Sequence, residues 1–158
     1  MSMSIEPNPN GVRSATVQPT PSQVVRSFLE ALAANDTETA VDLVASDIVY
    51  ENVGLPTIRG RERFAKGARQ FAARGIGFDV RIHRIAEEGS TVLTERTDAL
   101  FFRGYRSQFW VCGTFEITDG QISLWRDYFD FWAIARSSLR GLIGVAVPSV
   151  RARFDDRV

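Results

Sequence analysis

The stretch that decides the fold spans residues 91–129 and reads TVLTERTDALFFRGYRSQFWVCGTFEITDGQISLWRDYF. Aromatic and β-branched residues dominate three runs within it, and such residues favour strands. Short breaks at 103–105 and 118–120 each contain glycine and are typical of hairpin turns. We therefore predict three successive antiparallel strands, over residues 91–102, 107–117 and 121–129.

Helical patterns dominate the chain before these strands. Thr20-Pro21-Ser22-Gln23 is typical of a helix start, with Thr20 as the cap, proline at the first position and Gln23 at the third. The other predicted elements are a second helix from Asn35-Asp36 that carries Leu43 and Val44 on its apolar side, a strand over 48–53, a helix over 61–73, a strand over 78–86 and a last helix over 131–147. Helices followed by a run of antiparallel strands predict an α+β fold. A long curved sheet around the helices would leave a cone-shaped pocket.

The composition is typical of one globular domain. The chain has 158 residues, of which 44% are hydrophobic and 24% are charged. That length suits a single hydrophobic core, and we assign the domain to residues 21–150. Residues 1–20 are rich in Ser, Pro, Asn and Thr without periodicity, so we predict a disordered tail there. Residues 151–158 are predicted to form a C-terminal tail.

Charge and targeting patterns narrow the possible partners. The formal net charge is zero, which gives no electrostatic reason to expect nucleic acid or a membrane. The first twenty residues lack the basic head and apolar run of a signal peptide. The apolar run Leu139–Val147 is too short to span a bilayer. We therefore expect a cytoplasmic protein without integral membrane association.

The sequence offers little cysteine or histidine chemistry. Cys112 is the one cysteine, and its strand-like setting favours a small buried hydrophobe over a nucleophile. His83 is the one histidine, and the alternating pattern around it favours a position on a strand face. No His/Cys cluster with metal-ligand spacing occurs, so we expect neither a metal nor another cofactor.

Several charged and polar residues lie within predicted strands, where charge normally faces solvent or serves a function. Because side chains alternate along a strand, residues two apart share a face. The sets that share a face are Arg96, Asp98 and Leu100; Trp125, Asp127 and Phe129; and Tyr50 and Asn52. Polar groups thus accompany large apolar ones, which is typical of an apolar pocket with a few placed polar groups. Glu51, Glu95 and Arg126 have the opposite parity and are better candidates for ion pairs on the sheet surface.

Each acid also has a structural interpretation. Arg96 and Asp98 can form a structural ion pair, and Asp127 can hydrogen-bond a turn. Taken together, the two acids favour a site, because carboxyls in a dry pocket beside an arginine cannot both ionise easily. One acid and one base then exist at neutral pH. Such a pair can open a strained ring by protonating its oxygen and taking a proton from water, which a tyrosine hydroxyl and an asparagine amide can orient.

At these residues the sequence resembles the limonene-1,2-epoxide hydrolase family, and within it a mycobacterial branch. The resemblance extends from about Pro21 to Pro148. The segments that carry it are Val49-Tyr50-Glu51-Asn52-Val53-Gly54, Leu93-Thr94-Glu95-Arg96-Thr97-Asp98-Ala99-Leu100, Gln108-Phe109-Trp110-Val111-Cys112-Gly113 and Trp125-Arg126-Asp127-Tyr128-Phe129-Asp130.

The resemblance implies a curved, mixed six-stranded sheet of the nuclear-transport-factor-2-like fold, a homodimer, and cofactor-free hydrolysis of epoxides to vicinal diols. By the family pattern Asp98 is the general acid, Asp127 the general base, and Arg96 the bridge between them. Tyr50 and Asn52 hold the water together with Asp127, and Asp130 lies outside the catalytic set.

The same resemblance implies an apolar pocket for a small hydrophobic epoxide, which is a terpene, a lipid or a sterol-like compound. The residues expected to line it are Leu29, Leu32, Leu100, Phe109, Val111, Phe129, Ile134 and Leu142. Two alternatives stay open at the level of sequence. One is an isomerase or cyclase of the same fold that uses one acid as a base next to a carbonyl. The other is a non-catalytic lipid-binding protein.

Overall fold

The computed structural model describes residues 18–150 and residue 153. The predicted N-terminal tail lies outside the described residues except for residues 18–20. The predicted C-terminal tail lies outside them except for Arg153.

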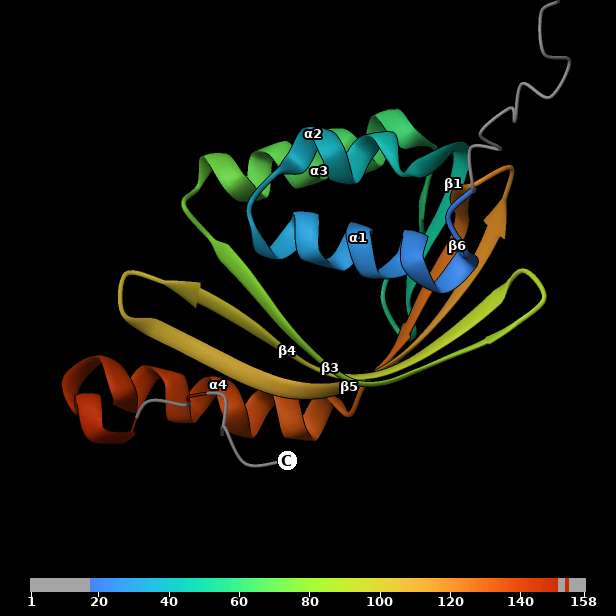
Figure 1. Cartoon of the computed structure of the whole chain (residues 1–158). Coiled ribbons are helices and arrows are strands. Elements are labelled where there is room, and N and C mark those ends of the chain that lie inside the picture. Colours follow the sequence, from blue (N-terminus) through green and yellow to red (C-terminus); the bar gives the residue numbers. More distant parts are fainter. Residues whose placement is uncertain (1–17, 151–152, 154–158) are drawn as a thin grey trace, which may run out of the picture.

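Three helices form one layer of the fold: α1 (Pro21–Ala33), α2 (Thr37–Asp42) and α3 (Arg61–Ala73). The predicted helix start is confirmed, because Thr20 Oγ1 accepts a hydrogen bond from the Gln23 amide at 3.3 Å and Gln23 Oε1 accepts one from the Thr20 amide at 2.8 Å. Figure 1 shows the three helices above the hollow side of a curved sheet. Val25, Phe28 and Leu29 on α1 are fully buried, so this helix supplies much of the core.

The sheet has six strands: β1 (Val44–Asn52), β2 (Ile58–Arg59), β3 (Gly77–Glu88), β4 (Thr91–Phe102), β5 (Tyr105–Thr118) and β6 (Gln121–Tyr128). Their order across the sheet is β2-β1-β6-β5-β4-β3. β1 runs parallel to β6, and the other neighbouring pairs are antiparallel. The predicted α+β class and the mixed six-stranded sheet are therefore confirmed. The parallel pair brings the first strand of the chain beside the last.

Besides shifts at several strand ends, the structure differs from the sequence prediction in the start of β1 and in an additional strand, β2. The predicted second helix included Leu43 and Val44, but α2 ends at Asp42 and β1 begins at Val44. Val44 is fully buried and pairs with Ile122 on β6, ahead of a register shift in β1. Pairing with a distant strand thus outweighs helical spacing. The two-residue strand β2 pairs with β1 and is too short to give a local sequence pattern.

An aromatic cluster joins α1 and α3 to the sheet. The ring of Phe28 lies 5.1 Å from that of Trp125 and 6.1 Å from that of Phe64, measured between centroids. Phe115 on β5 stacks on Trp125 at 6.0 Å. Edge and stacked contacts of this kind add to the free energy gained from burial. The cluster fixes the side chain of Trp125, two residues before Asp127.

The last helix, α4 (Phe131–Ala146), packs beside β5 on the side away from α1 to α3 (Figure 1) and is followed by a 3-10 turn, η1 (Pro148–Val150). The side of α4 that meets β5 carries small residues. A Cβ added to Gly141 would lie 2.7 Å from the Arg106 carbonyl oxygen, and Ser137 Oγ lies 2.5 Å from Ser107 Oγ. The larger apolar side chains of α4 therefore face outward. Within residues 18–150, no helix is long and apolar enough to cross a membrane.

Candidate active site

The centre of the site is the guanidinium of Arg96, which is completely buried. Its Nε donates to Asp98 Oδ1 at 2.9 Å and to Oδ2 at 3.2 Å, and its Nη2 donates to Asp127 Oδ2 at 2.5 Å. Its Nη1 donates to Thr94 Oγ1 at 3.0 Å. A buried cation is stable only when it is paired and hydrogen-bonded in this way. Two strands that are not neighbours, β4 and β6, thus meet at one guanidinium.

The strand register explains how Arg96 reaches across β5. Thr94 and Asp127 both pair with Gly113, one from each neighbouring strand. A Cβ added to Gly113 would lie 2.2 Å from Arg96 Nη1, 2.7 Å from Thr94 Oγ1 and 2.9 Å from Asp127 Oδ1. Contacts that short are excluded by van der Waals repulsion. The missing side chain of Gly113 therefore makes the space that the guanidinium fills.

Asp127 receives a second donor from the aromatic cluster. Trp125 Nε1 donates to Asp127 Oδ1 at 2.7 Å, so each oxygen of this carboxyl accepts a hydrogen bond. The Tyr50 ring stacks on Trp125 at 4.2 Å between centroids, and Tyr50 pairs with Trp125 in the parallel register of β1 and β6. Asn52 pairs with Asp127 in the same register. The four residues thus come from two neighbouring strands.

The two carboxyls titrate above the ordinary range. Burial raises the pKa of Asp98 to about 6, against the lowering effect of the Arg96 charge and hydrogen bond, and the charge of Asp127 raises it further. Burial also raises the pKa of Asp127, while Arg96 and the Trp125 hydrogen bond act to lower it. Burial acts to lower the pKa of Arg96, yet the two carboxylates raise it overall. The guanidinium therefore stays charged while the acids share their protons as a coupled pair.

The hydrogen bonds received by the two acids differ. Asp127 accepts from two different N–H donors, one on each oxygen, whereas both oxygens of Asp98 share the single N–H of Arg96 Nε. Donors stabilise the ionised form of a carboxyl. The larger number of donors therefore favours the ionised form more at Asp127 than at Asp98.

Tyr50 remains a proton donor over the physiological range. Burial, followed by the charge of Asp127, raises its pKa to about 12, against the lowering effect of a hydrogen bond to Asn52. Its hydroxyl and the Asn52 amide are both in the wall of the same cavity as Asp127. The cavity wall therefore contains a hydroxyl and an amide in addition to the carboxyl of Asp127.

The cavity has a volume of about 530 Å³ and lies between the helices and the hollow side of the sheet. Its wall is mostly apolar, and Asp98 and Asp127 reach it. Five of the eight predicted lining residues are part of this wall: Leu32, Leu100, Phe109, Phe129 and Ile134.

The structure corrects the prediction for the other three lining residues. Leu29 and Val111 are fully buried in the protein interior, away from the cavity surface. Leu142 is 63% exposed on the outward side of α4. Helical and strand periodicity gives the face on which a residue lies, but not how deep it sits behind its neighbours.

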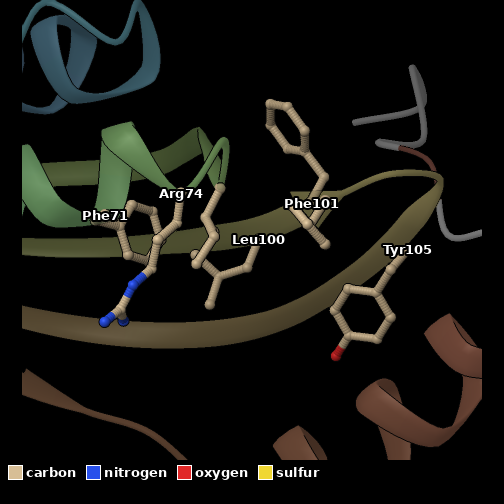
Figure 2. Close-up of a pocket in the computed structure, with 7 residues that line it drawn as sticks. Phe71, Arg74, Leu100, Phe101 and Tyr105 are labelled. Carbon is tan, nitrogen blue, oxygen red and sulfur yellow. The ribbon is translucent and has the colours of Figure 1, made fainter.

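A second apolar depression adjoins the cavity. It has a volume of about 580 Å³ and lies between the end of α3 and the β4/β5 hairpin (Figure 2). Phe71, Ile76 and Leu100 belong to the walls of both spaces. Arg74 lies at the depression with its side chain exposed. Apolar surface therefore continues past the cavity for a further stretch.

The residues predicted to face away from the site do so. Arg126 Nε donates to Glu51 Oε2 at 2.7 Å, and Glu95 forms an ion pair with Arg84. These pairs lie on the opposite side of the sheet from the cavity. Asp130 accepts a hydrogen bond from the Trp132 amide at 2.8 Å and so caps α4 rather than joining the acid pair.

The predictions for Cys112 and His83 differ in how they compare with the structure. Cys112 is only partly buried, and its even position on β5 puts it on the outward face of the sheet, so the prediction of a core position was wrong. The strong β pattern of its neighbours gave no sign of which face was outward. His83 lies exposed on β3, as predicted, with Nε2 2.9 Å from Thr97 Oγ1. Across residues 18–150 and 153, no group of three or more His, Cys, Asp and Glu is placed to hold a metal ion.

Three contact residues were missing from the predicted site. Trp125 and Thr94 each lie two residues before a predicted site residue, Asp127 and Arg96, so strand parity was a usable signal for both. Gly113 had no such signal, because its role depends on the pairing of β5 with β4 and β6.

Comparison with known proteins finds matches to epoxide hydrolases. The sequence model of the limonene-1,2-epoxide hydrolase catalytic domain matches residues 19–140. The chain is 51% identical over 128 residues to epoxide hydrolase EphG of Mycobacterium tuberculosis strain H37Rv, a match that covers 81% of this chain and 85% of that protein. A solved structure of an M. tuberculosis LEH-like epoxide hydrolase superposes with a TM-score of 0.82 at 48% identity, covering 85% of this chain and 95% of that one.

More distant structures share the fold alone. A putative polyketide cyclase from Pseudomonas putida has a TM-score of 0.62 at 19% identity, covering 75% of this chain and 98% of that one. Together with the curved sheet and its buried acid pair, the matches define an enzyme of the nuclear-transport-factor-2-like fold. Within that fold, the chain belongs to the limonene-1,2-epoxide hydrolase family.

Substituting Gly113→Ala is expected to lower the free energy of unfolding by about 1–3 kcal/mol, because the added methyl group overpacks the Arg96 guanidinium. The matched control is Gly67→Ala in α3, where an added Cβ meets no atom within 4 Å. That variant is expected to keep its stability or gain up to about 1 kcal/mol from helix propensity. Urea unfolding measures both, and equal losses in the two variants would contradict the close fit at Gly113.

Proposed function

We propose that this protein adds water to an apolar epoxide and releases a vicinal diol, in one step of general acid/base catalysis. The observation that carries the proposal is the contact of one buried guanidinium, Arg96, with both Asp98 and Asp127 at the wall of an apolar cavity. The family to which the chain belongs supports the same reaction.

The proposed step uses Asp127 as the base and Asp98 as the acid. Water attacks one epoxide carbon as its proton passes to Asp127, the C–O bond to that carbon breaks, and the freed oxygen takes the proton of Asp98. The negative charge thereby moves from Asp127 to Asp98. Arg96 contacts both carboxyls, so its positive charge offsets the negative charge before and after the step. Transfer of one proton back to Asp98 restores the starting state.

Tyr50 and Asn52 are proposed to hold the attacking water together with Asp127. Both line the cavity, and Asn52 pairs with Asp127 in the strand register. A water fixed by three groups has already lost the rotational freedom that otherwise adds to the barrier. Hydrolysis by this step requires neither a metal nor a covalent intermediate.

The substrate is proposed to be a largely apolar epoxide in the range from terpenes to lipids and sterol-like compounds. The mostly apolar wall of the main cavity favours a substrate with few polar groups. The adjoining depression supports the larger members of this range, because Phe71, Ile76 and Leu100 line both spaces. A panel of epoxides from terpene to sterol size, scored for diol formation, tests the proposal. Diol formation from none of them would overturn it.

An isomerase or cyclase reaction is less well supported by this site. Such chemistry uses a neutral proton donor beside the developing oxyanion. Here a charged Arg96 lies between the two acids. Side-by-side incubation with a 3-keto-Δ5-steroid and an epoxide separates the two reactions, and recovery of both compounds unchanged would indicate a binding protein.

We also propose a homodimer that forms through the outward face of the sheet. Leu93 and Trp110 are about half exposed on this face, beside the ion pairs Arg84–Glu95 and Arg126–Glu51. A surface that combines apolar groups with both signs of charge can match a second copy of itself.

The cytoplasmic location stays a prediction from the sequence.

Asp98→Asn and Asp127→Asn are each expected to lower kcat by about 10²-fold or more, because each removes a positioned proton donor or acceptor. The matched control is Asp47→Asn, an exposed acid on β1 outside the site, which should hydrolyse the epoxide at the wild-type rate. Steady-state assays of diol formation measure all three. Near wild-type turnover by either site variant would rule out the assigned roles.

Single-turnover reaction in ¹⁸O-labelled water is expected to put the label in the diol and none in the protein, because water attacks the epoxide directly. Mass spectrometry of the diol and of the digested protein reads out both. Label in a peptide that contains Asp98 or Asp127 would instead reveal an ester intermediate, which the one-step proposal excludes.

The pH dependence of kcat/KM is expected to be bell-shaped. The acid must carry its proton, so the rate falls as pH rises through the pKa of Asp98, about 6. At lower pH the rate falls as Asp127 gains a proton and ceases to act as a base. Asp98→Asn removes the alkaline limb from whatever activity remains. A flat wild-type profile between about pH 5 and 8 would contradict an acid/base pair.

A further inference from the structure

The outward side of α4 exposes large apolar side chains to solvent. Trp132 is 73% exposed, Leu139 60% and Leu142 63%, and Ile143 is also exposed. Their spacing puts them on one side of the helix, opposite the small residues that pack on β5. We call these four residues the outer face of α4. A contiguous apolar surface of this kind marks a site of interaction.

The charges beside this face have one sign. Arg136 and Arg140 are exposed on the same helix, and the sequence from Phe131 to Arg153 contains no acidic residue. Arg140 Nε donates to the neutral carbonyl of Val150, and within residues 18–150 and 153 no carboxylate forms an ion pair with either arginine. The zero net charge of the whole chain therefore conceals a local surface that is apolar and positive.

A second copy of the chain does not suit this surface. In a two-fold contact through α4, Arg136 and Arg140 of both copies would approach one another without an acidic residue on the helix to offset them. The outward face of the sheet differs, because its ion pairs Arg84–Glu95 and Arg126–Glu51 provide both signs. Charge complementarity therefore favours an anionic partner for α4.

We propose that the outer face of α4 docks onto an anionic lipid surface. Trp132 and the aliphatic side chains enter the interface, while Arg136 and Arg140 bind headgroup phosphates. Helices that combine Trp and Leu with a positive flank bind bilayer surfaces in this way without crossing them. This docking goes beyond the hydrolase reaction and is separate from it.

The position of the face relative to the cavity gives the docking a use. Phe131 and Ile134, in the first turns of α4, belong to the cavity wall, and Phe131 is also 49% exposed. The same helix thus joins the mouth of the cavity to the outer face. A lipid surface bound to the outer face of α4 would bring apolar epoxides dissolved in the lipid close to the mouth of the cavity.

Co-sedimentation of the full chain with vesicles tests the proposal without any substrate. Binding to phosphatidylcholine vesicles that contain about 30% phosphatidylglycerol is expected to exceed binding to pure phosphatidylcholine by about ten-fold, and to weaken as salt is added. The variant Leu139→Gln/Ile143→Gln is expected to lower binding by about ten-fold, with Gln chosen to keep helix propensity. Arg136→Gln/Arg140→Gln should lower binding to the anionic vesicles only.

Arg26→Gln, at an exposed arginine on α1, is the matched control and should bind vesicles as the wild type does. Circular dichroism and hydrolysis of a water-soluble epoxide check that the α4 variants are folded. Absence of wild-type binding to the anionic vesicles, or unchanged binding by both α4 variants, would overturn the proposal. So would conversion of a dimer to a monomer by the Leu139/Ile143 variant in size-exclusion chromatography, since the face would then be an interface between copies.

Discussion

The burial of the Arg96 guanidinium is the constraint on which the rest of the site depends. A charge taken out of water needs hydrogen-bond partners, and Asp98, Thr94 and Asp127 supply one for each of the three guanidinium nitrogens. Because these partners come from β4 and β6, the guanidinium must pass across β5, and only a residue without a side chain permits that passage at Gly113. The burial of this one cation thus depends on the strand order, on the register and on the glycine at position 113. Loss of any partner would leave a buried N–H group of Arg96 without its hydrogen bond.

The same burial that makes the cluster costly also makes it reactive. Removal from water raises the pKa of both carboxyls, while the guanidinium keeps the pair from becoming wholly neutral. The donors are distributed unequally, with two N–H groups on Asp127 and a single shared one on Asp98. Two chemically identical side chains thereby lie in different hydrogen-bonding environments. The aromatic cluster takes part in this difference, because Trp125 both packs against Phe28 and donates to Asp127. Trp125 thus links the packing of the core to the hydrogen bonding of Asp127.

The two faces of the molecule outside the site carry different chemistry. The outward face of the sheet has apolar residues beside paired charges of both signs, which suits a second copy of the chain. The outer face of α4 has apolar residues beside arginine alone. Small residues such as Gly141 allow α4 to lie close to β5, and this close packing turns its large side chains outward. An arrangement that fixes the rim of the cavity therefore also creates an exposed apolar surface near its mouth.

Capping residues and hydrophobic periodicity in the sequence determined the α+β class, the capped start of α1, and the shared face of Arg96 and Asp98. Sequence is sufficient for these features because caps and strand parity depend on residues only two or three apart. The tertiary structure alone decided the early start of β1 at Val44, the passage at Gly113, and the places of Leu29, Val111 and Leu142 away from the cavity. Each of these depends on which distant strand or helix lies alongside. Periodicity specifies the direction of a side chain, but the depth and partners that it meets are set by long-range pairing and packing, which no local pattern encodes.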